Sequence, residues 1–482
     1  MQARTPASTT RTWITCGTLF MLTLTPARTN GDAARPPAEL AATATAMRQE
    51  VERLRSIAFP HEVDVGVYTT TQMQAFLNAT PDESQAAPAT RSLAERGFQL
   101  VGLLPADAHL DTLTQAMFGT IAPPGIYDHV HHELRVLERP DGNYADFSVR
   151  LTLVHELTHA LDDQLFDLAR LADTGHATSD QENVWGALVE GSAVTIQEQY
   201  RAAATRSGNT PPAEIQQSAA EAAEQMRAMT TAPPIPAVFF ARFPSGVRFL
   251  QFGARHLLKT QAPDQPAPSL STLADVSAAV PSAYGTLPAS TEQILHPEKY
   301  WDPARRDAPA TFDDDAIEQM VATLGLRIAH RDTLGELLCA VVTSPADKRI
   351  NPMFMPLPGY WTTPAATGWD GDRLYVLVPS TPDASTAGQP QGLWITQWDT
   401  SADRDEFIAA YARHRPLPNR TVLTPDPRTA AFAFNLDAPT RRAVESRLRS
   451  HPPVRTVGTA HQCAPVEVPN HAQRHDPTQQ FR

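Results

Sequence analysis

Apolar residues recur at helical spacing along most of the first two thirds of the chain. In residues 38–57, for example, Met47, Val51 and Leu54 fall on one side, a spacing typical of a helix that packs against a core. Four stretches with this spacing predict long helices: residues 38–57, 71–104 with an interruption at Pro81, 147–168 and 180–203. This part of the chain is therefore expected to be mainly helical.

Alternation of apolar and polar residues is less common and predicts strands. In the helical part, residues 63–68 alternate, and residues 125–137 have strand character up to a turn at residues 140–143. Beyond about residue 329, strands and short amphipathic helices follow one another: strands at residues 372–378, 393–398 and 429–436, and helices at residues 401–414 and 439–449. The pattern predicts an α+β protein, with a mainly helical domain that has a small strand region and then a smaller α+β domain.

The length of the chain agrees with two domains. A chain of 482 residues exceeds what one hydrophobic core usually organises. We place the first domain at residues 30–328 and the second at residues 329–468, between a leader at residues 1–29 and a polar, disordered tail at residues 469–482. The role of the second domain and the oligomeric state cannot be read from these patterns.

The charge of the chain argues against one class of binding partner. The formal net charge is −13, and lysine and arginine are not clustered anywhere along the sequence. A nucleic-acid-binding protein needs a basic face that neutralises phosphates, so this class is disfavoured. An acidic surface favours solubility but does not identify a substrate.

The first residues have the layout of a secretory signal peptide. Arg4 and Arg11 precede an apolar stretch at residues 13–24, and small and polar residues follow at 25–27. Because the apolar stretch is too short to span a bilayer comfortably, no stable membrane span is expected after signal removal. We therefore expect export, to the periplasm or outside the cell, although an amphipathic or disordered arm is the other interpretation. Cys16 raises the alternative of a lipoprotein, but the three residues before it match such a signal poorly.

Once the leader is removed, Cys339 and Cys463 are the cysteines that remain. Two cysteines in an exported chain suggest one disulfide, but their proximity cannot be read from the sequence. Two unpaired buried thiols are an equally consistent interpretation.

The helix predicted at residues 147–168 contains the motif that carries the chemistry. Residues 154–160 read V-H-E-L-T-H-A, so His155 and His159 are four residues apart and lie on the same helix face. Two imidazole nitrogens in this arrangement can reach one tetrahedral ion. Glu156, next to the first histidine, is placed to take a proton from a metal-bound water. The alternative is a pair of histidines and a glutamate on a partly exposed helix.

A catalytic zinc normally takes three protein ligands, and the next predicted helix offers three glutamates. Glu182 follows Ser179 by three residues, a capping-box arrangement that closes the helix start. Glu198 lies among polar residues and is interpreted as solvated. Glu190 lies in the run G-A-L-V-E-G-S-A-V, where small residues allow two helices to approach closely and a metal would offset the cost of burying the carboxylate. We favour Glu190 as the third ligand, with a salt bridge in the core as the alternative.

These two segments resemble the gluzincins, the thermolysin-like group of zinc metallopeptidases. The resemblance covers roughly residues 125–200 and implies a zincin-like catalytic domain with a strand beside the substrate cleft. It implies that His155, His159 and Glu190 bind Zn²⁺ and that Glu156 is general base and later proton donor.

The sequence also departs from this group. Thermolysin-like enzymes have an aspartate four residues after the ligand glutamate that orients a histidine, and here that position is Val194. Asp162, Asp163 or a backbone carbonyl is expected to take over this role. The group also stabilises the oxyanion with a histidine or tyrosine, for which His296 and Tyr300 are candidates, although ordinary packing at a helix end is the alternative.

Three further histidines, His129, His131 and His132, lie in the segment with strand character. His129 and His131 share a face if the segment is a strand, which would allow metal binding. The interpretation we favour is that they line or flank the cleft.

The sequence therefore predicts an exported zinc metallopeptidase whose substrate is a protein or peptide. Two alternatives remain. One is a zinc hydrolase of a non-peptide substrate, because the same metal geometry activates water for other bonds. The other is an inactive envelope binding protein with a vestigial metal site, in which the C-terminal domain performs recognition.

Overall fold

The computed structural model describes residues 36–78, 88–110, 112–113, 123–168, 178–208, 210–229, 238–258, 273–348, 350–351, 354–357, 359–381 and 390–455. The predicted signal peptide with Cys16, the second cysteine Cys463 and the polar tail lie outside these residues. Cys339 is buried. Across the described part of the chain, no helix is long and apolar enough to cross a membrane.

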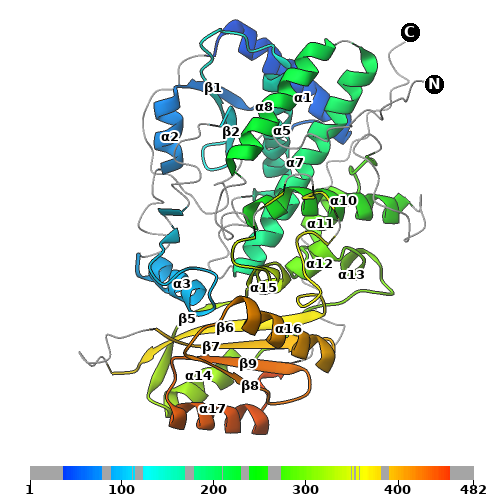
Figure 1. Cartoon of the computed structure of the whole chain (residues 1–482). Coiled ribbons are helices and arrows are strands. Elements are labelled where there is room, and N and C mark those ends of the chain that lie inside the picture. The colour runs from blue at the N-terminus through cyan, green and yellow to red at the C-terminus, as the bar shows by residue number, and fades with distance from the viewer. Residues whose placement is uncertain are drawn as a thin grey trace, which may run out of the picture.

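Long helices form the N-terminal body, in the upper half of Figure 1. The principal ones are α1 (Ala38–Arg55), α5 (Phe147–Phe166), α7 (Ser179–Ser207) and α10 (Arg242–Leu258). Their apolar faces meet in one core, in which Met47 and Val51 of α1 are buried and Leu54 is partly buried, as the helical spacing predicted. Asp146 caps α5 by accepting the N–H of Ser148.

The beginning of α7 corrects one prediction. Its N-cap is Thr178, and the capping box is completed by Gln181. Ser179 and Glu182, which the sequence suggested for this role, lie one position further along. The difference arises because Ser179 is engaged elsewhere, with its N–H and hydroxyl both donating to Asp332.

Helices α7 and α10 approach each other through glycine. A Cβ placed on Gly191 would lie 2.4 Å from the backbone of Gly246, and one on Gly246 would lie 1.8 Å from the carbonyl oxygen of Ala187. No larger residue fits at either position without separating the helices. The small residues around Glu190 therefore serve the contact with α10, and Glu190 itself lies on another side of α7.

A small sheet packs against α5. It consists of β1 (Asp64–Tyr68), β2 (Gly125–Asp128) and β3 (Glu133–Leu137), in the order β1-β3-β2, so that β2 is an edge strand. The single strand predicted over residues 125–137 is wrong, because the chain reverses at residues 129–132. Asp128 causes the reversal, since its side chain accepts the N–H groups of Val130 and His131.

The C-terminal region is a five-stranded antiparallel sheet, in the lower half of Figure 1. Its strand order is β5-β6-β7-β9-β8. The strands are β5 (Leu326–Asp332), β6 (Trp369–Pro379), β7 (Gln391–Trp398), β8 (Arg420–Leu423) and β9 (Thr429–Phe434). The sequence predicted the three central strands, but β5 and β8 at the two edges were missed.

Helices cover both faces of this sheet. On one face lie α14 (Asp314–Thr323) and α17 (Ala438–Ser450). On the other face lie α3 (Pro88–Leu100), α15 (Gly335–Val342) and α16 (Ser401–His414). Because α3 comes from the N-terminal part of the chain, that part contributes to the core of the C-terminal sheet. The α+β class is confirmed.

Shorter elements connect these parts: α2 (Thr70–Asn78), α8 (Pro212–Met229), η1 (Phe239–Ala241), α11 (Ala279–Gly285), α12 (Thr291–Leu295), α13 (Glu298–Trp301), β4 (Thr311–Phe312) and β10 (Val454–Arg455). Of these, α12 and α13 contact both α10 and one another. They lie between the helical body and the C-terminal sheet.

Candidate metal centre

Helix α5 presents two histidines from consecutive turns. His155 and His159 are each 1% exposed, and their ring centroids are 4.7 Å apart at an interplanar angle of 82°. The helix fixes this pairing, since side chains four residues apart lie on the same face. The predicted pair is thus fully buried and does not lie on an exposed helix face.

Glu190 of α7 completes a group of three ligand side chains. Its Oε2 lies 3.4 Å from Nε2 of His155 and 3.9 Å from Nε2 of His159, and it is 3% exposed. Ligand atoms of a tetrahedral site with bonds of about 2.0–2.1 Å lie about 3.3–3.4 Å apart. One atom from each side chain falls within 4.8 Å of the others, a spacing that suits a single ion. We call these three residues the histidine cluster.

Burial dominates the electrostatics of the histidine cluster. It raises the pKa of Glu190 above its usual value. Burial and the proximity of His155 together lower the pKa of His159 well below its usual value. For His155, burial opposes protonation, but the hydrogen bond to Glu190 and the charges of Glu156 and Glu190 together outweigh it and the pKa is raised. A divalent cation would stabilise the carboxylate and the neutral imidazoles, the forms that act as ligands.

Glu156 lies beside the histidine cluster, against strand β2. It is 1% exposed, and its Oε2 accepts the backbone N–H of Tyr127 at 2.8 Å. A Cβ on Gly125 would lie 2.7 Å from Thr152 and 3.5 Å from Glu156, so glycine allows the strand to lie close to α5. The edge strand therefore runs directly over the proposed general base.

Gln197 orients His155, and the sequence did not reveal this role. Its Oε1 lies 2.9 Å from Nδ1 of His155, and Gln197 is 1% exposed. With an amide oxygen as acceptor, Nδ1 donates and Nε2 is left to bind a metal. The available signal was spacing, because Gln197 follows Glu190 by seven residues, or two helical turns on the same face.

The aspartates expected to orient a histidine have other partners. Asp162 accepts the guanidinium of Arg55 at 2.6 Å. Asp163 accepts the hydroxyl of Tyr127 at 2.8 Å and lies 3.0 Å from Nδ1 of His132. For His155 the prediction is wrong, because its Nδ1 lies against Gln197, whereas these contacts of Asp162 and Asp163 fix α1 and the β2–β3 hairpin against α5.

The three histidines of the hairpin differ from one another. His131 pairs with Asp128 at 2.7 Å, and His132, whose φ is 55°, pairs with Asp163. His129 is 7% exposed, and burial lowers its pKa below the usual value. Its charge would also act on His159, which places it on the side of the hairpin that faces the histidine cluster.

Two other glutamates of α7 were interpreted from local context, and both interpretations are wrong. Glu198 is 4% exposed and pairs with Arg201 at 3.1 Å, so it is buried and not solvated. Burial raises the pKa of Glu182 to about 7, and the charge that opposes this shift is that of Arg242 on α10. Neither residue belongs to the histidine cluster.

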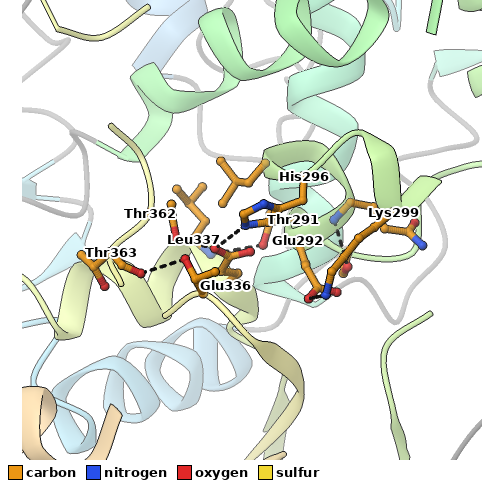
Figure 2. Close-up of polar contacts among 12 residues, drawn as sticks. Thr291, Glu292, His296, Lys299, Glu336, Leu337, Thr362 and Thr363 are labelled. Atoms are coloured by element: carbon orange, nitrogen blue, oxygen red, sulfur yellow. Dashed lines mark hydrogen bonds and ion pairs between the residues drawn. The ribbon is translucent and has the colours of Figure 1, made fainter. Parts of the chain in front are cut away.

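His296 and Tyr300, the candidates for oxyanion stabilisation, make their hydrogen bonds elsewhere. His296 lies 3.0 Å from the carboxylate of Glu336, and Figure 2 shows the ring turned toward Glu336 and Thr362. The hydroxyl of Tyr300 donates to the carbonyl of Thr286 at 2.5 Å. In this structure, neither residue is bonded to the histidine cluster.

A second group of possible ligands lies beside α12 and already contains a cation. Glu292, Asp307 and Asp399 bring carboxylates within 4.8 Å of one another. The amino group of Lys299 lies 2.5, 2.9 and 3.4 Å from these three carboxylates, in the order given. We call these four residues the lysine cluster. Figure 2 shows Lys299 reaching Glu292.

Comparison with known proteins bears on the C-terminal region alone. Residues 323–447, which span the five-stranded sheet, match a family model described as a domain of unknown function, DUF8575. No curated protein and no solved structure matches the chain.

Proposed function

We propose that this protein is an exported zinc-dependent metallopeptidase. The observation that carries the proposal is the convergence of His155, His159 and Glu190 from two helices into one buried site, with Glu156 adjacent. Two histidines and a carboxylate are the ligand set of catalytic zinc sites that keep one position open. The resemblance to gluzincins in the two segments that supply these residues supports the same conclusion.

The residues of the chain have distinct roles in this proposal. Bound zinc would supply Lewis acidity that activates water and polarises the scissile carbonyl. Glu156 takes the proton from the attacking water and then delivers it to the leaving amine. The N–H of Tyr127 holds the Glu156 carboxylate, and Gln197 holds the ring of His155.

Strand β2 favours a peptide over other substrates. It has β3 on one side and no other strand partner among the described residues. The N–H of Tyr127 points away from β3, toward Glu156. Because this N–H is taken by Glu156, a peptide that adds to the edge would pair with main-chain groups on either side of Tyr127, which would bring its scissile bond beside the general base.

The variant Glu156→Gln tests the proposal. It should retain about one zinc per chain, because Glu156 is not a ligand, and lose hydrolysis by a factor of about 10²–10⁴, the usual contribution of a general base. Zinc is measured by mass spectrometry of the purified protein, and hydrolysis by digestion of a broad peptide library. The library also separates a peptidase from a zinc hydrolase of other bonds.

Glu198→Gln is the matched control, since Glu198 is another buried glutamate but pairs with Arg201. It should retain both zinc and activity. Normal turnover by Glu156→Gln would refute the assigned general base. A wild-type protein that binds zinc but cleaves nothing in the library would refute the peptidase.

A further inference from the structure

A polar cavity lies between α10, α12 and the segment that follows α15. It has a volume of about 70 Å³, and its walls include Ser245, Arg248, His296, Met355, Trp361 and Thr362. Since one water needs about 10–15 Å³ by this measure, the cavity holds several waters or a small polar ligand. None of the histidine-cluster residues lines it.

Arg248 contributes a guanidinium whose donors are only partly used by the protein. One guanidinium nitrogen, Nη1, donates to the carbonyl of Leu295 at 2.5 Å. The other two nitrogens donate to no acceptor in the described part of the chain, and no carboxylate there forms an ion pair with Arg248. Burial lowers the pKa of Arg248 below its usual value, although Glu298 and Glu336 oppose this effect at longer range. A partly buried guanidinium with free donors favours an anion.

His296 also lines the cavity and is held by Glu336. Glu336, which is fully buried, accepts from Nε2 of His296 at 3.0 Å and from the hydroxyl of Thr362. Figure 2 shows these three side chains converging, with His296 coming from the end of α12 and Glu336 from α15. Both donors use Oε1 of Glu336. Rotation of the His296 ring would break its hydrogen bond to this oxygen. The hydroxyl of Ser245, on α10, adds a further donor at the cavity wall.

The remainder of the wall is apolar. Met355 and Trp361 line the cavity, and Leu357 lies at its edge with 46% of its surface exposed. Trp361 also lines a neighbouring cavity of about 60 Å³, whose walls are mainly aliphatic and aromatic. A cavity that combines anion donors with an indole ring suits a ligand with two chemically different ends.

We propose that this cavity binds a carboxylate that carries an apolar group, with the carboxylate on Arg248 and Ser245 and the apolar group against Trp361. The guanidinium fork matches the geometry of a carboxylate. Two sources share this chemistry, a small organic acid and the C-terminus of a peptide. None of the residues that line the cavity belongs to the histidine cluster, so its existence does not rest on the proposed peptidase activity.

Binding is tested with N-acetyl-leucine and with N-acetyl-leucinamide, which has the same apolar group without the carboxylate. Isothermal titration calorimetry of the full chain should detect the acid and not the amide. Loss of the charged partner in Arg248→Met should weaken binding by about tenfold or more, the usual cost of losing a charge-assisted hydrogen bond. The affinity of an acetylated tetrapeptide that ends in leucine is compared with that of N-acetyl-leucine. Tighter binding of the tetrapeptide identifies the C-terminus of a peptide as the ligand, and tighter binding of N-acetyl-leucine identifies a small organic acid.

The chain offers a matched control on the same helix. Arg255 lies seven residues after Arg248 on α10, and burial also lowers its pKa, but it does not line the cavity. Arg255→Met should bind the acid as the wild type does. If Arg248→Met fails to fold, Ser245→Ala and Trp361→Phe provide milder changes at the two ends of the ligand, and each should weaken binding.

Four results would overturn the proposal. They are equal binding of the acid and the amide, unchanged binding in Arg248→Met, equal binding of inorganic phosphate, and loss of binding when zinc is removed with a chelator. The last result would place the carboxylate on the metal. All four measurements can be made whether or not the peptidase assay detects hydrolysis, so either proposal can be refuted without the other.

Discussion

The histidine cluster and the lysine cluster are alternative solutions to the same electrostatic problem. Both bring three potential metal ligands within 4.8 Å of one another. In the lysine cluster, the amino group of Lys299 supplies the compensating charge. In the histidine cluster, the ion pairs of Glu190 among the described residues are with the two histidines themselves.

The difference indicates what distinguishes a metal site from an ordinary carboxylate cluster. Arg242 is the nearest fixed positive charge that acts on Glu190, and it does so without forming an ion pair. Its guanidinium lies over Gly186, one turn before Glu190, and donates to Asn183. A cluster that contains its own lysine has no need of an ion, whereas buried ligands without one do. We therefore expect zinc in the histidine cluster and not in the lysine cluster.

The largest expected effect comes from changing one glutamate in each cluster. Glu190→Gln should lower the zinc content from about one per chain to near zero, because a neutral amide is a poor zinc ligand. Glu292→Gln, which neutralises a carboxylate that is equally buried, should leave the zinc content unchanged. Zinc is measured in both variants after dialysis against a weak chelator.

The opposite outcome would reverse the assignment. If Glu190→Gln retained zinc and Glu292→Gln lost it, the metal would belong to the lysine cluster. Loss of zinc in both variants would indicate that the two changes unfold a common core, which circular dichroism of the same samples would detect.

Removing the amino group of Lys299 should lower the free energy of unfolding and leave the zinc content unchanged. Lys299→Met leaves Glu292 buried, with 1% of its side chain exposed, and without its partner. Breaking a buried pair in this way costs about 3–5 kcal/mol. The free energy of unfolding in urea, followed by tryptophan fluorescence, should fall by this amount while the zinc content stays at about one per chain.

Lys348→Met is the matched control. Lys348 is an exposed lysine that forms no ion pair among the described residues, and its amino group lies 5.3 Å from the ring centroid of Tyr360. Its replacement should cost about 1 kcal/mol or less. Equal destabilisation by both changes would mean that the lysine cluster contributes nothing specific.

The sequence predicted the members of the histidine cluster better than their surroundings. Helical spacing sets the relation between His155 and His159, and the small residues around Glu190 marked a buried position on the next helix. Those small residues proved to contact α10, so the reason given for choosing Glu190 was only partly right. Its approach to the histidines depends on how α5 packs against α7, which no local pattern encodes.

Long-range contacts account for most of what was missed. The partner of His155 is Gln197, whose polar neighbours gave no sign of burial. The reversal at residues 129–132 was hidden because apolar residues lie on both sides of it and the Asp128 turn was not recognised. The packing of α3 on the C-terminal sheet joins segments more than 200 residues apart, and sequence periodicity carries no information about such a contact.

A smaller effect concerns the residue that orients His155. Gln197→Ala should weaken zinc affinity by about 10–100-fold, as is typical for a group that fixes a metal ligand. Gln199→Ala is the control, because Gln199 lies on the same helix but donates to the carbonyl of Ala274. Competition with a chromogenic chelator measures both affinities. Equal affinities in the two variants would show that Gln197 does not position His155.

The smallest expected effect is a difference in pH dependence. Burial lowers the pKa of His155, but its contacts with Glu190 and the charge of Glu156 together outweigh burial and raise it. Because zinc binds the neutral ring, protons compete with the ion. Zinc affinity should therefore weaken as pH falls below this pKa, by about tenfold per pH unit for one proton.

The lysine cluster should respond to pH independently of zinc. The carboxylates of Glu292, Asp307 and Asp399 together outweigh burial and raise the pKa of Lys299 above its usual value, so the charge of Lys299 is lost only in alkali. Burial also raises the pKa of Glu292 well above its usual value. In Lys299→Met, protonation of Glu292 at low pH relieves the cost of the unpaired carboxylate, so the difference in stability between wild type and this variant should decrease between pH 8 and pH 5 by the same amount with and without zinc. If the decrease depended on zinc, the two clusters would be coupled, and the lysine cluster would have to be treated as part of the metal centre.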